Sequence, residues 1–221
     1  MLVYKPQDND YNAELDNLGI GKSPVIDMTD VALGVCLNTY EELEAYLRSC
    51  KRDVTELIVY HTGTPNRLNM DLIGLRKYYS NELDKNRVDY HLLILRNGQI
   101  QIGWNISEES SHTPVSNHVP RSVSVAFVGG LNSRGTAEDP KGFTGSQWKS
   151  YSALLRAYYS IKPGGQVLGH NSINANTNNP GFNVEDFSYS RFGKRNAVDN
   201  ETFRSLGSLT KTQIISFGSA Y

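Results

Sequence analysis

Short apolar runs are the feature of this sequence that most limits what the chain can fold into. The longest ones, at residues 57–60, 92–95 and 123–128, contain only four to six residues and end at polar or turn-forming residues. Runs of that length are typical of buried strands, whereas a helix that crosses a bilayer needs roughly 18 apolar residues. The sequence therefore predicts a soluble chain whose core contains several short strands.

Amphipathic segments lie between these runs and predict helices, so the expected fold is α/β. Helices are expected at residues 40–48, 70–83 and 145–160, and strands at residues 56–60, 90–95, 99–104, 122–128 and 166–169. Thr144 is the predicted N-cap of the last helix, because its hydroxyl can accept from a free backbone N–H. Asn97 and Gly98 predict a type I′ hairpin turn, since both residue types tolerate a positive φ. Residues 171–181 are so rich in turn formers that no regular element is expected there.

The texture of the sequence divides the chain into four segments. Residues 1–37 are predicted to form an extended N-terminal arm, because Pro and Gly interrupt a polar stretch that has little periodicity. Residues 38–53 are predicted to contain a short helix and a linker, and residues 54–187 the compact domain. Residues 188–221, rich in Ser, Gly and Asn, are predicted to form a C-terminal arm with a weak strand at residues 213–218. Arms of this composition stay ordered mainly when they lie on a neighbour, so we expect partner chains.

Charge, cysteine content and the N-terminus exclude several classes of protein. The chain of 221 residues has 22 Lys+Arg and 23 Asp+Glu, a net charge of -1, and no basic stripe, so no nucleic-acid partner is expected. The N-terminus lacks a basic segment followed by an apolar one, so we expect the chain to fold in a cytoplasm. Cys36 and Cys50 are too few for a disulfide framework and lack zinc-knuckle spacing, so both are expected to be ordinary thiols.

Two histidines follow predicted buried strands directly. His61 comes after the strand at residues 56–60, and His170 after the strand at residues 166–169. If these strands are parallel or neighbouring, both imidazoles lie at one edge of the sheet, where open α/β sheets bind their ligands. A pair of imidazoles there indicates a metal site or an acid–base arrangement. For either histidine alone, the alternative is a turn residue that bonds to the backbone.

A succession of motifs runs through residues 54–187. The motifs are LIVYHTGTP at 57–65, VDYHLLILRNG at 88–98, SH at 111–112, RSVSVAFVGG at 121–130, GH at 169–170 and PGFNV at 180–184. Their order and spacing resemble those of the zinc N-acetylmuramoyl-L-alanine amidases of the phage lysozyme and peptidoglycan-recognition type. The resemblance implies a mixed central β-sheet flanked by helices, here with extended N- and C-terminal arms.

The resemblance also implies a site. In such amidases zinc is held by a histidine after the first strand, a histidine after the last core strand, and a Cys, His or Asp just before the Pro of the final motif. Carried over, His61 and His170 match the two imidazole ligands, and Tyr90 matches a tyrosine that assists catalysis. Asn179 stands at the third ligand position, where its neutral amide is a poor substitute for a thiolate or carboxylate. Thr177 falls near an assisting position, where threonine occurs in some relatives.

The remaining histidines have other implied roles. His112 matches a histidine in the loop that borders the groove of these amidases, so a substrate contact is expected. His91 should face away from Tyr90, because side chains alternate along a strand, and a packing role is expected. His118 is expected to be a solvated loop residue.

Three functions follow from this reading. The first is a phage tail or baseplate protein whose amidase-like domain has an eroded zinc site and a structural or cell-wall-contacting role. The second is an active zinc amidase that cleaves the bond between N-acetylmuramic acid and L-alanine during injection or lysis. The third is a peptidoglycan-binding module without catalysis. Peptidoglycan and other tail or baseplate subunits are the expected partners, with no membrane partner, and the expected location is the virion tail after synthesis in the host cytoplasm.

Overall fold

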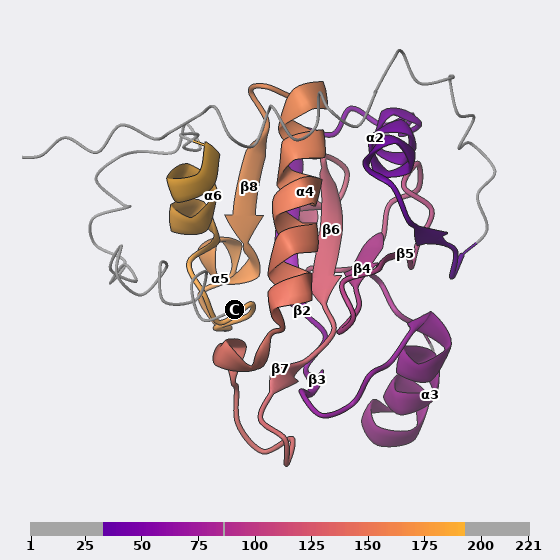
Figure 1. Cartoon of the computed structure of the whole chain (residues 1–221), viewed down its shortest axis with the longest axis vertical. Coiled ribbons are helices and arrows are strands. Elements are labelled where there is room, and N and C mark those ends of the chain that lie inside the picture. The colour runs from indigo at the N-terminus through magenta and orange to yellow at the C-terminus, as the bar shows by residue number, and fades with distance from the viewer. Residues whose placement is uncertain (1–32, 86, 193–221) are drawn as a thin grey trace, which may run out of the picture.

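A computed structural model describes residues 33–85 and 87–192 of the chain (Figure 1). Most of the two predicted arms, including the weak strand expected at residues 213–218, lies outside the described residues. None of the helices in the described part of the chain is long and apolar enough to cross a bilayer.

One six-stranded sheet with the strand order β1-β5-β4-β6-β2-β8 forms the centre of the fold. Its strands are β1 (Cys36–Leu37), β2 (Glu56–His61), β4 (Leu92–Ile94), β5 (Ile100–Ile102), β6 (Ser122–Phe127) and β8 (Gln166–Gly169). Strand β2 pairs in parallel with β6 and β8, and β4 pairs in parallel with β6, whereas β5 is antiparallel to both β4 and β1. A small second sheet pairs β3 (Thr64–Pro65) with β7 (Gly130–Leu131) in parallel. The predicted mixed sheet is confirmed.

Helices cover both faces of this sheet (Figure 1). The helices are α2 (Tyr40–Arg48), α3 (Leu72–Leu83), α4 (Gly145–Ile161), α5 (His170–Ile173) and α6 (Val184–Phe192), with short 3-10 turns η1 (Ser116–His118) and η2 (Pro140–Gly142). The alternation of side chains along β2 explains the two layers. Leu57 and Val59 pack in the core that includes α2, α4 and α6, whereas Ile58 and Tyr60 pack with α3.

Reciprocal side-chain caps begin helices α2 and α4. The Thr144 hydroxyl accepts from the Gln147 backbone N–H, and the Gln147 side chain accepts in return from the Thr144 N–H. Thr39 and Glu42 form the same reciprocal pair at α2. Such capping boxes satisfy backbone donors that have no partner inside the helix. The predicted N-cap at Thr144 is confirmed.

The hairpin between β4 and β5 has a different turn from the one predicted. Gly98 has a φ of 90°, but Asn97 does not have a positive φ, so the turn is not type I′. The Gly98 N–H instead donates to the Leu95 carbonyl (2.8 Å), and Asn97 Oδ1 accepts from the Gln99 N–H (3.0 Å). A turn closed in this way and followed by a positive-φ glycine is typical of a three-residue hairpin loop.

The packed unit extends further than residues 54–187. Strand β1 joins the sheet through β5, and α2 buries Leu43, Tyr46 and Leu47 in the core it shares with α4. Because these apolar side chains are buried, residues 36–48 pack on the domain and do not form a linker. Helix α6 continues to Phe192, and α5 occupies the start of the stretch 171–181, where no regular element was expected.

Candidate functional site

Two histidines lie at the edge of the sheet where the parallel strands end. His61 is the last residue of β2, and His170 follows the last residue of β8 and begins α5. The register pairs Val59 with Gly169, so the two strands end at almost the same level. The structure therefore brings the two predicted imidazoles to one edge, where α/β sheets with parallel strands commonly place their sites.

The ring of His61 is buried, with 5% of the residue exposed. Its Nδ1 accepts from the Gly63 N–H (3.0 Å). Burial lowers the pKa of His61 to about 4; the Glu138 carboxylate opposes this effect and His170 adds to it. The imidazole is thus neutral near pH 7, and because Nδ1 is an acceptor, its proton lies on Nε2. Nε2 is buried and has no hydrogen-bond partner within the described residues.

A glycine leaves room for this ring. Gly130 has a φ of 101°, and a Cβ atom built on it would lie 2.3 Å from Cγ of His61. A larger residue at position 130 would therefore collide with the imidazole and would also need a backbone conformation that L side chains rarely adopt.

Asn179 is held by the backbone of His61. Its Oδ1 accepts from the His61 N–H (2.7 Å), and its Nδ2 donates to the His61 carbonyl (3.0 Å). These two bonds fix the orientation of the amide, because only the oxygen can accept and only the nitrogen can donate. Nδ2 also lies 3.3 Å from His61 Nδ1. Asn179, at the third ligand position, thus directs an N–H group of its amide, and no oxygen lone pair, toward the His61 imidazole.

The arrangement does not fit a zinc ion. Zinc is held by thiolate, neutral imidazole or carboxylate groups that each offer a lone pair. Nδ1 of His61 already accepts from Gly63 and faces the Asn179 amide nitrogen, while Nε2 carries the proton. Within residues 33–85 and 87–192, no three His, Cys, Asp or Glu side chains lie together so that they could hold a metal ion.

Tyr60 connects the other members of the site, although the sequence did not single it out. Its ring lies 4.7 Å from the ring of His170 and 5.3 Å from the ring of Tyr90, measured between centroids. Burial raises the pKa of Tyr90 to about 12 and lowers that of His170. The phenol of Tyr90 is therefore protonated at neutral pH and can act as a hydrogen-bond donor.

His112 reaches the site through Tyr60. Its Nδ1 bonds with the Tyr60 hydroxyl (2.8 Å) and its Nε2 with the Ser122 hydroxyl (3.0 Å). With 8% of the residue exposed and both nitrogens engaged, His112 supports the Tyr60 ring from within the core. Its expected contact with a substrate stays a prediction.

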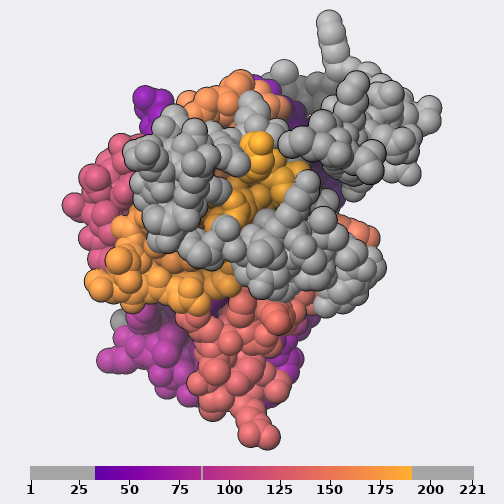
Figure 2. Space-filling view, turned by 90° about the vertical axis from the view of Figure 1, so that its left-hand side faces the viewer, coloured from indigo at the N-terminus to yellow at the C-terminus, as the bar shows by residue number. Residues whose placement is uncertain are grey.

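Two side-chain hydrogen bonds hold the loop at residues 177–179, just before the final motif. Thr177 Oγ1 accepts from the Asn179 N–H (3.2 Å), so the predicted assisting hydroxyl is engaged inside the loop. Asn178 Nδ2 donates to the Glu138 carboxylate (2.7 Å), which lies beyond β7. Figure 2 faces this side of the molecule and shows the orange α5 and α6 region above the salmon segment that contains β7 and η2. Glu138 is thus the carboxylate that the fold brings toward His61.

The two remaining histidines are structural. His91 is fully buried, as its predicted packing role requires, and bonds with Ser124 and with the Glu108 carbonyl. His118 was expected to be solvated, but its Nδ1 lies 2.7 Å from the buried Glu56 carboxylate, so that expectation is wrong. Glu56 attracts it because a buried carboxylate needs charged or hydrogen-bonding partners.

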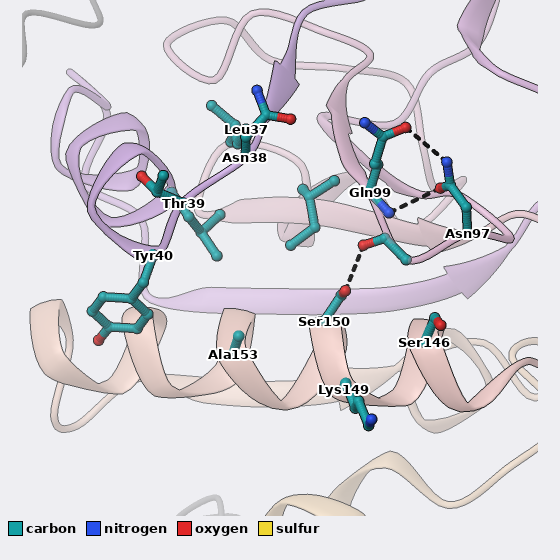
Figure 3. A pocket seen from close by; sticks show the side chains of 13 residues that line it. Leu37, Asn38, Thr39, Tyr40, Asn97, Gln99, Ser146, Lys149, Ser150 and Ala153 are labelled. Carbon is teal, nitrogen blue, oxygen red and sulfur yellow. Dashed lines mark hydrogen bonds between the residues drawn. The ribbon is translucent and has the colours of Figure 1, made fainter. Parts of the chain in front are cut away.

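Cavities lie elsewhere on the domain. One of about 380 Å³ is bounded by α2, the β4–β5 turn and α4, and Figure 3 shows amide and hydroxyl side chains around it, including Asn38, Gln99 and Ser150. In Figure 3 the ammonium group of Lys149 points away from this space. None of the site residues predicted from the sequence lines it.

Comparison with solved structures identifies the fold. The endolysin N-acetylmuramoyl-L-alanine amidase LysCS from Clostridium intestinale superposes with a TM-score of 0.51 at 18% sequence identity, over 75% of this chain and 93% of that chain. Sequence comparison finds the endolysin of Escherichia phage T7, 27% identical over 126 residues, which are 56% of this chain and 79% of the relative. Peptidoglycan-recognition protein 2 of Holotrichia diomphalia is 31% identical over 78 residues, which are 33% of this chain and 41% of that protein.

The mixed sheet, its flanking helices and the histidines at two strand ends define the class of amidase and peptidoglycan-recognition folds. The family model for N-acetylmuramoyl-L-alanine amidase matches residues 51–182, more than half of the chain. The chain belongs to this family.

Proposed function

We propose that this chain binds peptidoglycan through an amidase-like domain whose zinc site is eroded, and that it does not hydrolyse the polymer. The observation that carries the proposal is the side-chain amide of Asn179, which both accepts from and donates to the backbone of His61. Family membership supports peptidoglycan as the ligand, and the named relatives are endolysins and a peptidoglycan-recognition protein.

Loss of zinc affinity follows from the chemistry of the third position. A catalytic zinc needs three protein ligands and one open position that activates water or polarises a carbonyl. To offer its oxygen to a metal, Asn179 would have to break its bond to the His61 N–H and leave a buried donor without a partner. Even then it would supply a neutral oxygen in place of an anionic ligand.

Retention of binding follows from what the fold keeps at the same edge. Tyr90 and His170 still flank the ring of the buried Tyr60, and both are partly exposed and carry polar groups that can contact a glycopeptide. Recognition of a polar ligand needs hydrogen-bonding groups in fixed positions and does not require a metal.

Zinc content and sacculus binding test the proposal together. The full chain, equilibrated with zinc and freed of excess, should carry well below stoichiometric zinc, sediment with purified sacculi and release no peptides from them. Replacing Asn179→Cys should raise zinc content toward stoichiometric, because a thiolate replaces the amide. Asn176→Cys, an exposed position in the same loop, is the matched control and should gain no zinc. Stoichiometric zinc together with peptide release by the parent chain would overturn the proposal in favour of a working amidase.

The sacculus experiment also locates the binding site. His170→Ala should reduce the amount of protein that sediments, since it removes a polar group at the end of β8. Lys149→Met, on the exposed side of α4, should leave sedimentation unchanged. Equal sedimentation of the His170 variant and the parent would show that another surface binds peptidoglycan.

We further propose that the chain is a phage tail or baseplate component, made in the host cytoplasm and carried in the virion tail. Two observations support this: several relatives are phage endolysins, and residues 1–50 and 183–221 lie outside the region that the family model matches. The proposal predicts that an antibody against the chain labels the tails of purified virions. Detection only in the lysate after virions are removed would contradict it.

A further inference from the structure

A second cavity lies at the edge of the sheet opposite the candidate site. Its volume is about 330 Å³, which is near the lower end of the range for small-molecule sites. Val54, just before β2, and Val123, near the start of β6, line it together with the C-terminal end of α4. Since β2 and β6 are parallel and His61 lies at the other end of β2, the length of that strand separates the cavity from the histidines.

One wall of this cavity lies outside the stretch that matches the family model. Leu47 and Arg48 of α2 and Cys50 after it line the cavity, and all three precede residue 51, where the match to the family model begins. Helix α2 and the residues after it therefore close one side of the cavity.

The cavity combines an apolar interior with positive charge. Five of its lining residues are aliphatic: Leu47, Val54, Ile106, Val123 and Ile161. Three are cations, Arg48, Arg52 and Lys162, and no Asp or Glu lines it. This composition is complementary to a molecule with a hydrocarbon part and an anionic group.

The cations differ in how far acids on the protein neutralise them. Arg48 pairs with Glu44 (2.8 Å), and Lys162 lies 3.7 Å from the exposed Asp53. Arg52 makes no ion pair with a carboxylate in the described part of the chain, but its guanidinium donates to the carbonyls of Ile106, Val119, Pro120 and Ser122 and lies 3.2 Å from His91 Nε2. The donors of Arg52 are thus engaged inside the protein, and Lys162, whose acidic neighbour is the exposed Asp53, is the cation most open to an anion from outside.

Two further polar groups, the Tyr158 hydroxyl and the Cys50 thiol, belong to residues of the cavity wall. Tyr158 is 3% exposed, and its hydroxyl is buried with no hydrogen-bond partner among the described residues. Leaving such a group unpaired costs stability, so a ligand that bonds to it recovers that cost. Cys50 is a free thiol whose sulfur lies 3.2 Å from the Ile106 carbonyl oxygen.

We propose that this cavity binds a small carboxylate with a hydrocarbon chain, its tail among the aliphatic side chains and its head near Lys162 and the Tyr158 hydroxyl. The site is independent of the His61 edge and of any metal there. Its ligand class is a medium-chain fatty acid or another monocarboxylate of similar size.

Protection of Cys50 tests the proposal. In the full chain carrying Cys36→Ser, the rate at which neutral iodoacetamide modifies Cys50 should fall as octanoate is added. Octanol, which lacks the charge, should need a roughly threefold to fivefold higher concentration for the same protection, because one ion pair at a partly exposed site contributes up to about fivefold in affinity. Octylammonium should give no protection. Equal protection by octanoate and octanol would overturn the carboxylate assignment, and no protection by octanoate would overturn the site.

Variants separate binding from folding. Lys162→Met should weaken octanoate binding by roughly twofold to fivefold, and Lys149→Met, on the same helix as Tyr158 but outside this cavity, should not. Tyr158→Phe should weaken octanoate binding while the unfolding midpoint without octanoate stays the same or rises, since the removed hydroxyl has no partner there. Unchanged octanoate affinity in both Lys162→Met and Tyr158→Phe would refute the proposed position of the head group. Zinc content and sacculus binding play no part in these measurements, so this proposal and the proposed function can fail separately.

Discussion

Lowering the pH should destabilise this domain through His91. Its Nδ1 accepts from the Ser124 backbone N–H (3.0 Å), and its Nε2 lies 3.0 Å from the Glu108 carbonyl, so the neutral ring carries its proton on Nε2. A second proton would have to enter at Nδ1, directly against the Ser124 N–H. Burial lowers the pKa of His91 to about 3; the bond to the Glu108 carbonyl opposes this effect, and the charges of Arg52 and His112 add to it.

The size of the effect follows from the two pKa values of His91. The unfolded chain takes up the proton near the ordinary value of about 6.5, whereas the folded chain does so only near 3. Stability is therefore fully present above about pH 6.5 and is lost as the pH falls toward 3. Between pH 7 and pH 5 the contribution of this one residue amounts to about 2 kcal/mol.

Urea unfolding of the parent and of His91→Gln at both pH values isolates this contribution. The variant should be less stable at pH 7, because Ser124 loses its acceptor, but its free energy of unfolding should fall less on acidification. The difference between the two losses should be about 2 kcal/mol, since effects of the other histidines are common to both proteins and cancel. If both proteins lose the same stability between pH 7 and pH 5, the interpretation of His91 as a buried neutral imidazole is wrong.

Three substitutions test contacts that shape the site and its helix. Asn179→Ala should lower the free energy of unfolding by roughly 2 kcal/mol, because the His61 N–H and carbonyl both lose a partner; an unchanged urea midpoint would contradict the described amide orientation. Gly130→Ala should cost more than about 2 kcal/mol through its collision with the His61 ring and its positive φ, so wild-type stability in thermal unfolding would refute that contact. Thr144→Ala should cost about 1 kcal/mol by removing the cap of α4, whereas Thr144→Ser should largely restore the melting temperature.

Elements with strong periodicity could be predicted from the sequence alone. The strand at residues 166–169 has the predicted bounds, and α4 differs from its predicted bounds by a single residue, Ile161. In both cases the local pattern and the tertiary environment agree, because the apolar face of α4 packs on the sheet. The prediction of a type I′ turn at Asn97 and Gly98 was wrong because Asn tolerates but does not require a positive φ. A positive φ at Gly98 alone was enough to close the hairpin.

The histidines of the site could be predicted, but their surroundings could not. His61 and His170 are visible because each follows a short apolar run, and position after a parallel strand carries over into space. Tyr60 was not singled out because it has the composition of a core residue, and its contact with His170 depends on strand register. The sequence showed Asn179 to be a weak ligand, but the direction of its amide depends on a residue 118 positions away in the chain.

The tie between Asn179 and His61 joins the last loop to the end of β2 with groups that belong to the chain itself. A loop held by a bound ion gains stability by mass action, as the logarithm of the free ion concentration relative to its dissociation constant. An intramolecular tie has no such concentration term. Its strength is therefore the same in a metal-poor compartment as in a metal-rich one, and the shape of this edge of the sheet is encoded in the sequence alone.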